Sequence, residues 1–89
     1  MFSLEYFGND IYKILKILHE NQIKVREDKF APLSQQEIAD MASFSKVKIN
    51  LLLNELIDNG FVEIFQNKRG KYALTDKGDK VTTIMIKQL

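Results

Sequence analysis

The sequence predicts a mainly helical α+β domain, in which a three-helix core carries a β-hairpin and a C-terminal helix. Apolar residues recur at the three-and-four spacing of one helical face in four separate stretches. Between the third and the fourth stretch, two short apolar runs flank a polar, turn-prone segment, which predicts the hairpin. At 89 residues the chain is long enough for one compact domain and too short for two ordinary cores. We therefore expect a single domain over residues 1–89.

The composition excludes several classes of protein. Apolar residues make up 45% and charged residues 28% of the chain, which is typical of a folded, soluble domain. There is no cysteine and the only histidine is His19, so we expect no disulfide, no metal site and no cofactor. The apolar runs are far shorter than the ~20 residues that span a bilayer, and residues 1–5 do not resemble a secretion signal. A cytoplasmic location without a membrane partner is expected.

The first helix is predicted from Asn9 to about Arg26. Its apolar face consists of Ile11, Ile14, Leu15 and Leu18. Residues 27–33 then break the helical period, and Pro32 disfavours helical backbone at the residue before it. We expect a short extended connector in this segment.

A second helix is predicted to begin at Gln35 and to last about two turns. Ser34 and Glu37 have the spacing of a capping box, in which each side chain accepts a hydrogen bond from a free backbone N–H. The residues expected on its inward face are Ile38, Ala39, Met41 and Ala42.

The third helix is predicted from Lys46 to about Asn59. Ser45 is suited to cap its start, and Gly60 supplies the left-handed residue that ends many helices. Its inward face is expected to contain Ile49, Leu52, Leu53 and Leu56.

Residues 61–74 are predicted to form the hairpin. Its strands are expected over residues 61–65 and 71–74, with a basic tip at 66–70. Thr75 can then cap a last helix over residues 75–89. The apolar stripe of that helix is expected to contain Val81, Ile84, Met85 and Leu89.

A short helix, a turn and a longer helix form a helix-turn-helix, and residues 34–59 have this form. Three patterns stand around it in order: Leu33-Ser34-x-x-Glu37-Ile38-Ala39, Leu56-x-x-x-Gly60-Phe61-Val62 and Tyr72-x-Leu74-Thr75-x-x-Gly78. With them the chain resembles the winged helix-turn-helix regulators of bacteria, archaea and their mobile elements, including the multiple-antibiotic-resistance type. The resemblance covers nearly everything from residue 33 onward. It implies a helix-turn-helix at 34–59, a wing at 61–74 and a C-terminal helix at 75–89.

In such a fold the third helix enters the DNA major groove and the wing reaches the flanking backbone or minor groove. The residues expected to contact DNA are Ser45, Lys46, Val47, Lys48, Asn50, Leu51 and Asn54 on the helix, and Lys68, Arg69 and Lys71 on the wing. Lysines suit phosphates or guanine edges, asparagines suit adenine, and exposed apolar side chains suit thymine methyl groups. This set indicates a site that favours A·T pairs. The competing interpretation is an ordinary solvated helix face and a charged loop tip.

The function expected from this resemblance is sequence-specific binding of double-stranded DNA by a small transcriptional regulator that acts as a repressor. We expect a homodimer through the N-terminal segment and the C-terminal helix, because one helix-turn-helix makes few contacts. One alternative is a replication initiator or partition protein of a plasmid or virus. Another is a protein-interaction winged helix that uses Val47 and Leu51 and binds no DNA. No nucleophile with a base, paired carboxylate site or phosphate-binding loop is evident, so we do not expect an enzyme.

Overall fold

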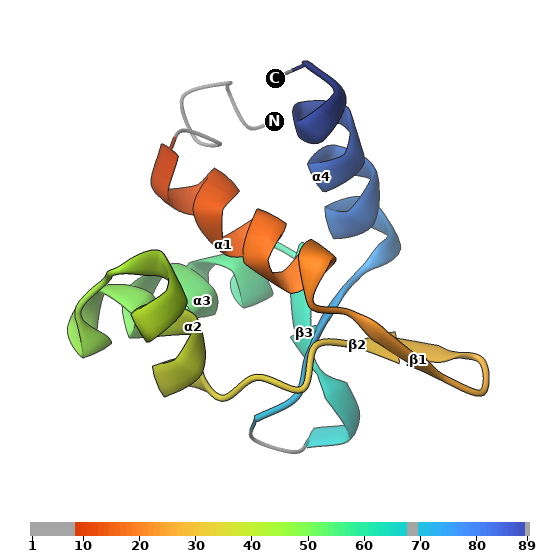
Figure 1. The fold of residues 1–89 in the computed structure, drawn as a ribbon, viewed down its shortest axis with the longest axis horizontal. Coiled ribbons are helices and arrows are strands. Elements are labelled where there is room, and N and C mark those ends of the chain that lie inside the picture. The colour runs from red at the N-terminus through yellow and green to blue at the C-terminus, as the bar shows by residue number, and fades with distance from the viewer. Residues whose placement is uncertain (1–8, 68–69, 89) are drawn as a thin grey trace.

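The computed structural model describes residues 9–67 and 70–88. Its elements in chain order are α1 (Asn9–Glu20), β1 (Ile23–Val25), β2 (Asp28–Phe30), α2 (Gln35–Ala42), α3 (Lys46–Asp58), β3 (Val62–Ile64), the 3₁₀ turn η1 (Phe65–Asn67), β4 (Tyr72–Leu74) and α4 (Asp76–Gln88). This order confirms the predicted mainly helical α+β class (Figure 1). Helix α4 packs against α1, and the β3–β4 hairpin follows α3 directly.

Helix α1 ends at Glu20, so the prediction that it continues to about Arg26 was wrong. Asn21 closes its last turn, because the backbone N–H and Nδ2 of this residue both donate to the carbonyl oxygen of Ile17, at 3.1 and 2.8 Å. Beyond this point the β-branched residues of β1 alternate with a lysine, a pattern that favours extended backbone.

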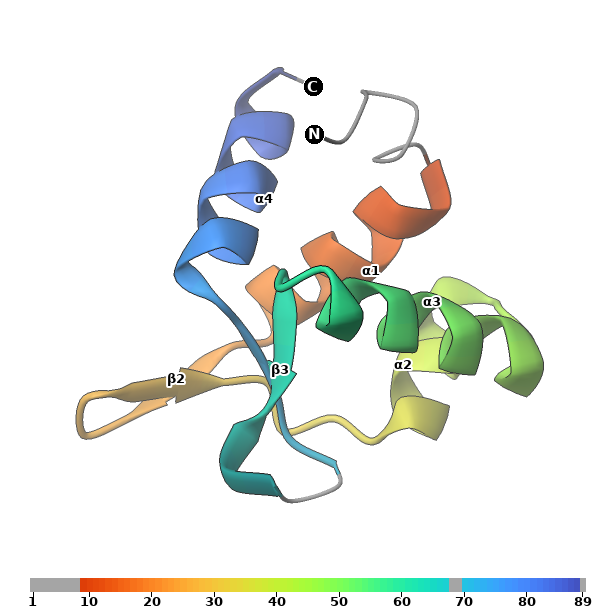
Figure 2. The ribbon, with the colours of Figure 1, turned by 180° about the vertical axis from the view of Figure 1, so that it is seen from behind.

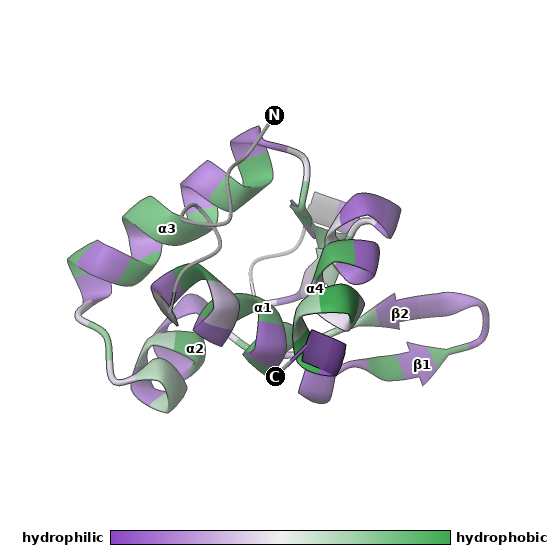
Figure 3. Cartoon of the chain, turned by 90° about the horizontal axis from the view of Figure 1, so that it is seen from above, coloured by the Kyte–Doolittle hydropathy of each residue, from purple (hydrophilic) through white to green (hydrophobic). Residues whose placement is uncertain are grey.

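A hairpin of β1 and β2 occupies most of the segment where the sequence indicated only the end of a helix and a connector. The strands are antiparallel, with Ile23 opposite Phe30. Arg26 lies in the turn with a φ of 60°, a left-handed value that hairpin turns usually assign to Gly or Asn. That missing turn signal concealed the hairpin in the sequence. In Figure 3 the hairpin extends away from the helices.

The two hairpins are joined where β2 ends. Ala31 forms an isolated bridge with Tyr72 of β4, with backbone N–H to O distances of 2.7 and 3.1 Å. Beside the bridge, the rings of Phe30 and Phe65 stack with their centroids 4.6 Å apart. The first hairpin is thereby fixed against the second one.

The start of the helix-turn-helix is formed by the predicted capping box. The backbone N–H of Glu37 donates to Ser34 Oγ at 3.1 Å, and the N–H of Ser34 donates to Glu37 Oε1 at 3.0 Å. Helix α3 begins where predicted, since Ser45 Oγ accepts a hydrogen bond from the N–H of Lys48 at 3.1 Å. The prediction that Met41 points inward was wrong, because this side chain is 50% exposed while its neighbours Ile38, Ala39 and Ala42 are buried.

The wing strands are shorter than the predicted 61–65 and 71–74. They pair in antiparallel register with Ile64 opposite Tyr72, and a 3₁₀ turn replaces the end of the first strand. Pairing nevertheless extends one step further, because the N–H of Phe65 donates to the carbonyl oxygen of Lys71 at 2.8 Å. The basic tip that the sequence predicts at residues 68 and 69 lies outside the described residues.

The core lies between α1, α2, α3 and the two wing strands, and its fully buried large side chains include Ile14, Leu15, Leu18, Ile38, Ile49, Leu53, Leu56 and Phe61. Helix α4 begins after Thr75, as predicted: the Oγ1 of this residue accepts from the N–H of Gly78 at 3.0 Å and donates to the carbonyl oxygen of Gly60 at 2.6 Å. The hydroxyl thus joins the start of α4 to the end of α3.

Seen from behind, α3 and the β1–β2 hairpin lie on opposite sides of β3 (Figure 2).

Candidate nucleic-acid interface

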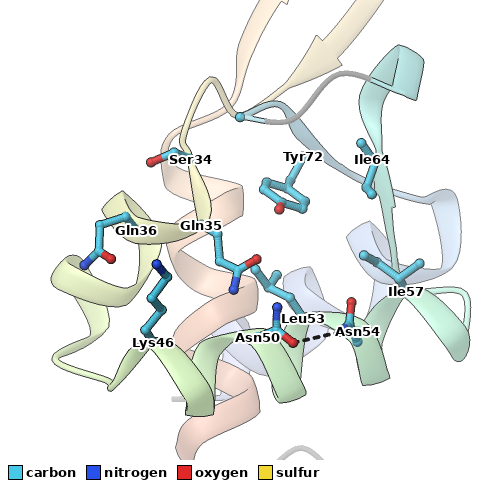
Figure 4. Close-up of a pocket in the computed structure, with 11 residues that line it drawn as sticks. Ser34, Gln35, Gln36, Lys46, Asn50, Leu53, Asn54, Ile57, Ile64 and Tyr72 are labelled. Carbon is cyan, nitrogen blue, oxygen red and sulfur yellow. Dashed lines mark hydrogen bonds between the residues drawn. The ribbon is translucent and has the colours of Figure 1, made fainter.

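A groove of about 500 Å³ lies between α3, the start of α2 and the wing. It is lined by Ser34, Gln35, Gln36, Lys46, Asn50, Leu53, Asn54, Ile57, Ile64, Gly70 and Tyr72. Figure 4 shows that α3 forms one wall, the first turn of α2 a second and the wing strands a third. The groove therefore depends on the packing of three elements that are distant in the sequence.

Helix α3 contributes a row of polar side chains to this groove. Lys46, Asn50 and Asn54 are each four residues apart, so they lie one above another on the same side of the helix. Asn54 Nδ2 donates a hydrogen bond to Asn50 Oδ1 at 3.1 Å (Figure 4). The row offers one cation and two amides along a single line.

The first turn of α2 faces this row across the groove. Ser34, Gln35 and Gln36 bring a hydroxyl and two amides to the site. They lie at the N-terminal end of the helix, which the side chains of Ser34 and Glu37 cap. The Gln36 amide is already oriented, because its Nε2 donates to Asp40 Oδ1 at 2.9 Å. Hydrogen-bond donors therefore border the groove on two sides.

Apolar residues form the base of the groove. Leu53 and Tyr72 are buried, with 1% and 7% of their surfaces exposed. The wing strands bring Ile64 and Tyr72, which are paired across the sheet, to the same face. A packed base of this kind holds the polar rows on either side at a fixed separation.

The charges on the two faces of the wing differ sharply. Among the described residues, the groove on the Tyr72 face is lined by no carboxylate. Alternate residues of a strand point to opposite faces of the sheet, so Ala73 and Tyr72 lie on different faces of the wing. The face that carries Ala73 borders a second cleft, with a volume of about 320 Å³. That second cleft is lined by the carboxylates of Glu27, Asp28, Glu63, Asp76 and Asp79. With Lys29 as the one cation among its described lining residues, this second cleft repels a polyanion more strongly than the groove does.

The structure brings three of the sequence-predicted site residues, Lys46, Asn50 and Asn54, into the groove. Two more, Val47 and Leu51, lie beside it on the outer side of α3 with exposures of 72% and 64%. They are one turn apart and form a short apolar row next to the amides. Polar and apolar segments alternate along this helix in Figure 3.

Lys48 points elsewhere. Its Nζ lies 2.7 Å from Asp10 Oδ2 in α1 and 4.4 Å from the centre of the Phe44 ring. The amine of Lys48 is therefore held on the α1 side of the helix, away from the groove.

Ser45 is exposed, and its hydroxyl is engaged as the cap of α3.

Of the predicted wing residues, only Lys71 lies within the described part of the chain. Its Nζ is 5.1 Å from the centre of the Phe30 ring, on the hairpin that joins the wing at Ala31. Lys68 and Arg69 lie outside the described residues. The wing contributes Gly70, Ile64 and Tyr72 to the groove.

Sequence reasoning missed the groove residues that come from outside α3. Gln35 and Gln36 appear in the sequence only as the first turn of a helix, and Tyr72 only as an apolar strand residue. The one available signal was the capping box, which fixes where α2 begins and so which residues form its first turn. Their position opposite α3 follows from helix packing alone.

No protein-family model matches the chain, and no curated protein matches its sequence. The structure is similar to the crystal structure of a transcriptional regulator of the CRP/FNR family from Thermus thermophilus, with a TM-score of 0.61 and 16% sequence identity. The match covers 82% of this chain and 38% of that one, so this chain corresponds to little more than a third of the regulator. This likeness and the element order establish a winged helix-turn-helix fold. Neither observation supports the more specific resemblance to regulators of the multiple-antibiotic-resistance type.

Two further properties of the described residues are relevant to the site. None of the helices in this part of the chain is long and apolar enough to cross a membrane. Within the same residues, no three His, Cys, Asp or Glu side chains are grouped so that they could hold a metal ion.

Proposed function

We propose that this chain binds double-stranded DNA through the groove beside α3 and acts as a transcriptional regulator. The observation that carries the proposal is the absence of carboxylates from the described lining of this groove, while five acidic residues line the cleft on the other face of the wing. DNA phosphates are repelled from the acidic face. They can approach the face that presents Lys46 and four amides.

Helix α3 enters the major groove in this arrangement. Its exposed side carries both hydrogen-bonding groups, on Asn50 and Asn54, and apolar groups, on Val47 and Leu51. These are the two kinds of group that read base edges in the major groove. The first turn of α2 contacts the phosphates, as the first helix of a helix-turn-helix does. Lys68, Arg69 and Lys71 of the wing remain proposed contacts to the flanking backbone.

Regulation follows from occupancy, because a protein seated on an operator blocks polymerase or a competing factor. A homodimer would address two half-sites about one helical turn, ~34 Å, apart. Helix α4 supports this part of the proposal, since Ile84 is 54% exposed on a helix in which Val81 and Met85 pack onto the core. The N-terminal segment, proposed as the second part of the interface, lies outside the described residues.

The test is the binding of labelled mixed-sequence duplex DNA, followed by fluorescence anisotropy at several salt concentrations. Wild type should bind with an affinity that falls steeply as salt rises, and Lys46→Glu should weaken it strongly. Lys24→Glu is the matched control, because this exposed lysine lies on β1, in the hairpin on the far side of β3 from α3. If wild type shows no salt-dependent binding at low ionic strength, or if both variants weaken binding equally, the proposal fails.

A second candidate function has one observation in its favour. The exposed apolar pair Val47 and Leu51 could bind a protein partner, as in winged helices without DNA binding. Failure of the salt-series experiment would direct attention to this pair.

A replication initiator or partition protein would use the same groove, and repeated sites in the bound DNA would distinguish it from a regulator.

A further inference from the structure

The hydrogen bond between Asn50 and Asn54 restricts what the two amides can offer to a ligand. An amide oxygen accepts hydrogen bonds and an amide nitrogen donates two. The bond of 3.1 Å uses Asn50 Oδ1 and one N–H of Asn54 Nδ2. Among the described residues, Asn50 Nδ2 and Asn54 Oδ1 are left without a partner. Both atoms point into the groove in Figure 4.

The pair thus presents one donor and one acceptor side by side. Without the bond, each amide could rotate and exchange its oxygen for its nitrogen. With the bond, reversal of one amide alone would place two oxygens or two nitrogens opposite each other, so the two amides can reverse only together. In the structure the donor lies at Asn50 and the acceptor at Asn54, and joint reversal would again leave one donor and one acceptor.

Adenine is the base that complements this order. Its major-groove edge presents an acceptor, N7, beside a donor, the N6 amino group, whereas guanine presents two acceptors, N7 and O6. We propose that Asn50 and Asn54 act together as one adenine reader, in which Asn50 Nδ2 donates to N7 and Asn54 Oδ1 accepts from N6. A guanine at this position would bring its O6 against Asn54 Oδ1, which repels it.

The apolar row of α3 extends this reading to the other strand. Val47 and Leu51 are exposed next to the amides, and the thymine paired with an adenine carries a methyl group in the same groove. Contact of these side chains with the methyl group adds a preference for thymine that does not depend on hydrogen bonds. The two rows together specify an A·T pair from both of its bases.

This inference rests on the proposed DNA binding, and it is tested with modified bases after a preferred site has been selected from random duplexes. Replacing each adenine of the site in turn with 7-deaza-adenine removes N7 and keeps base pairing. At one position the replacement should weaken wild-type binding by about 10-fold, the discrimination expected for one good base contact. In Asn50→Ala the same replacement should have no effect. Uracil in place of the paired thymine should weaken wild type, and should not weaken a Val47→Ala/Leu51→Ala variant.

The outcomes separate the two proposals. If the chain binds no DNA at low salt, the proposed function is wrong. If it binds and selects a site, yet 7-deaza-adenine is tolerated at every position, DNA binding stands and the adenine reader is overturned. The reader is equally overturned if Asn50→Ala keeps the same sensitivity to 7-deaza-adenine as wild type, because the N7 contact then belongs to another residue.

Discussion

Gly78 of α4 lies directly against the carbonyl group of Phe61, where α3 passes into the wing. A Cβ built on Gly78 would be 1.9 Å from the carbonyl oxygen of Phe61 and 2.9 Å from its carbonyl carbon. Both atoms belong to the backbone, so they cannot rotate away. The hydrogen bond from the N–H of Thr75 to the same oxygen, at 3.1 Å, holds it in place. The position of α4 relative to the wing therefore depends on a glycine at 78.

Gly78→Ala should lower the free energy of unfolding by about 1–3 kcal/mol, the usual cost of overpacking a close contact. The measurement is urea denaturation followed by circular dichroism. Lys80→Ala, at an exposed position on the same helix, is the control and should leave the stability almost unchanged. Equal stabilities of the two variants would show that α4 can move away from Phe61 at little cost.

The turn between α2 and α3 contains two serines for which we predict opposite effects. Ser43 has a φ of 60°, and the N–H of Phe44 donates to the carbonyl oxygen of Ala39 at 2.9 Å, as at helix ends where glycine is usual. Ser43→Gly should stabilise the domain by about 0.5–1 kcal/mol, because glycine adopts this backbone without strain. Ser45→Ala should destabilise it by about 1 kcal/mol, because the cap of α3 is lost. Thermal unfolding measures both, and a loss of stability in Ser43→Gly would contradict the first prediction.

The two lysines at the start of α3 should differ in their effect on DNA affinity. Lys46→Ala removes a cation from the groove and should reduce the slope of log affinity against log salt by about 1. Lys48→Ala removes the same charge from an ion pair with Asp10 and should change the slope less. Anisotropy titrations of both variants under the same conditions make the comparison. A larger effect at Lys48 would mean that its amine leaves Asp10 when DNA binds.

Ile84→Glu should weaken the proposed dimer without unfolding the domain, because a charge on this exposed side chain is tolerated in the monomer and costly in an apolar interface. Sedimentation equilibrium of wild type and variant tests this prediction, with circular dichroism as the check on folding. Lys80→Glu is the matched control on the same helix. A wild type that remains monomeric at high concentration would rule out this interface.

The sequence alone determined the elements whose signals are local. The starts of α2, α3 and α4 follow from Ser34, Ser45 and Thr75, since a capping side chain bonds to a backbone N–H only three residues away. The buried faces of α1 and α3 follow from helical periodicity, and the wing follows from two apolar runs around a polar turn. The winged helix-turn-helix fold was therefore predictable from residues that are close together in the chain.

The tertiary structure decided what depends on partners distant in the sequence. The β1–β2 hairpin was missed because its turn, at Arg26, lacks the usual residue, and its position depends on Tyr72 and Phe65 of the wing. Periodicity could show that Lys46 and Lys48 are both outside the core. It could not show that Asp10 of α1 would bind one of them and leave the other in the groove. A side chain takes its direction from the charges and rings packed around it, and these come together only when the chain folds.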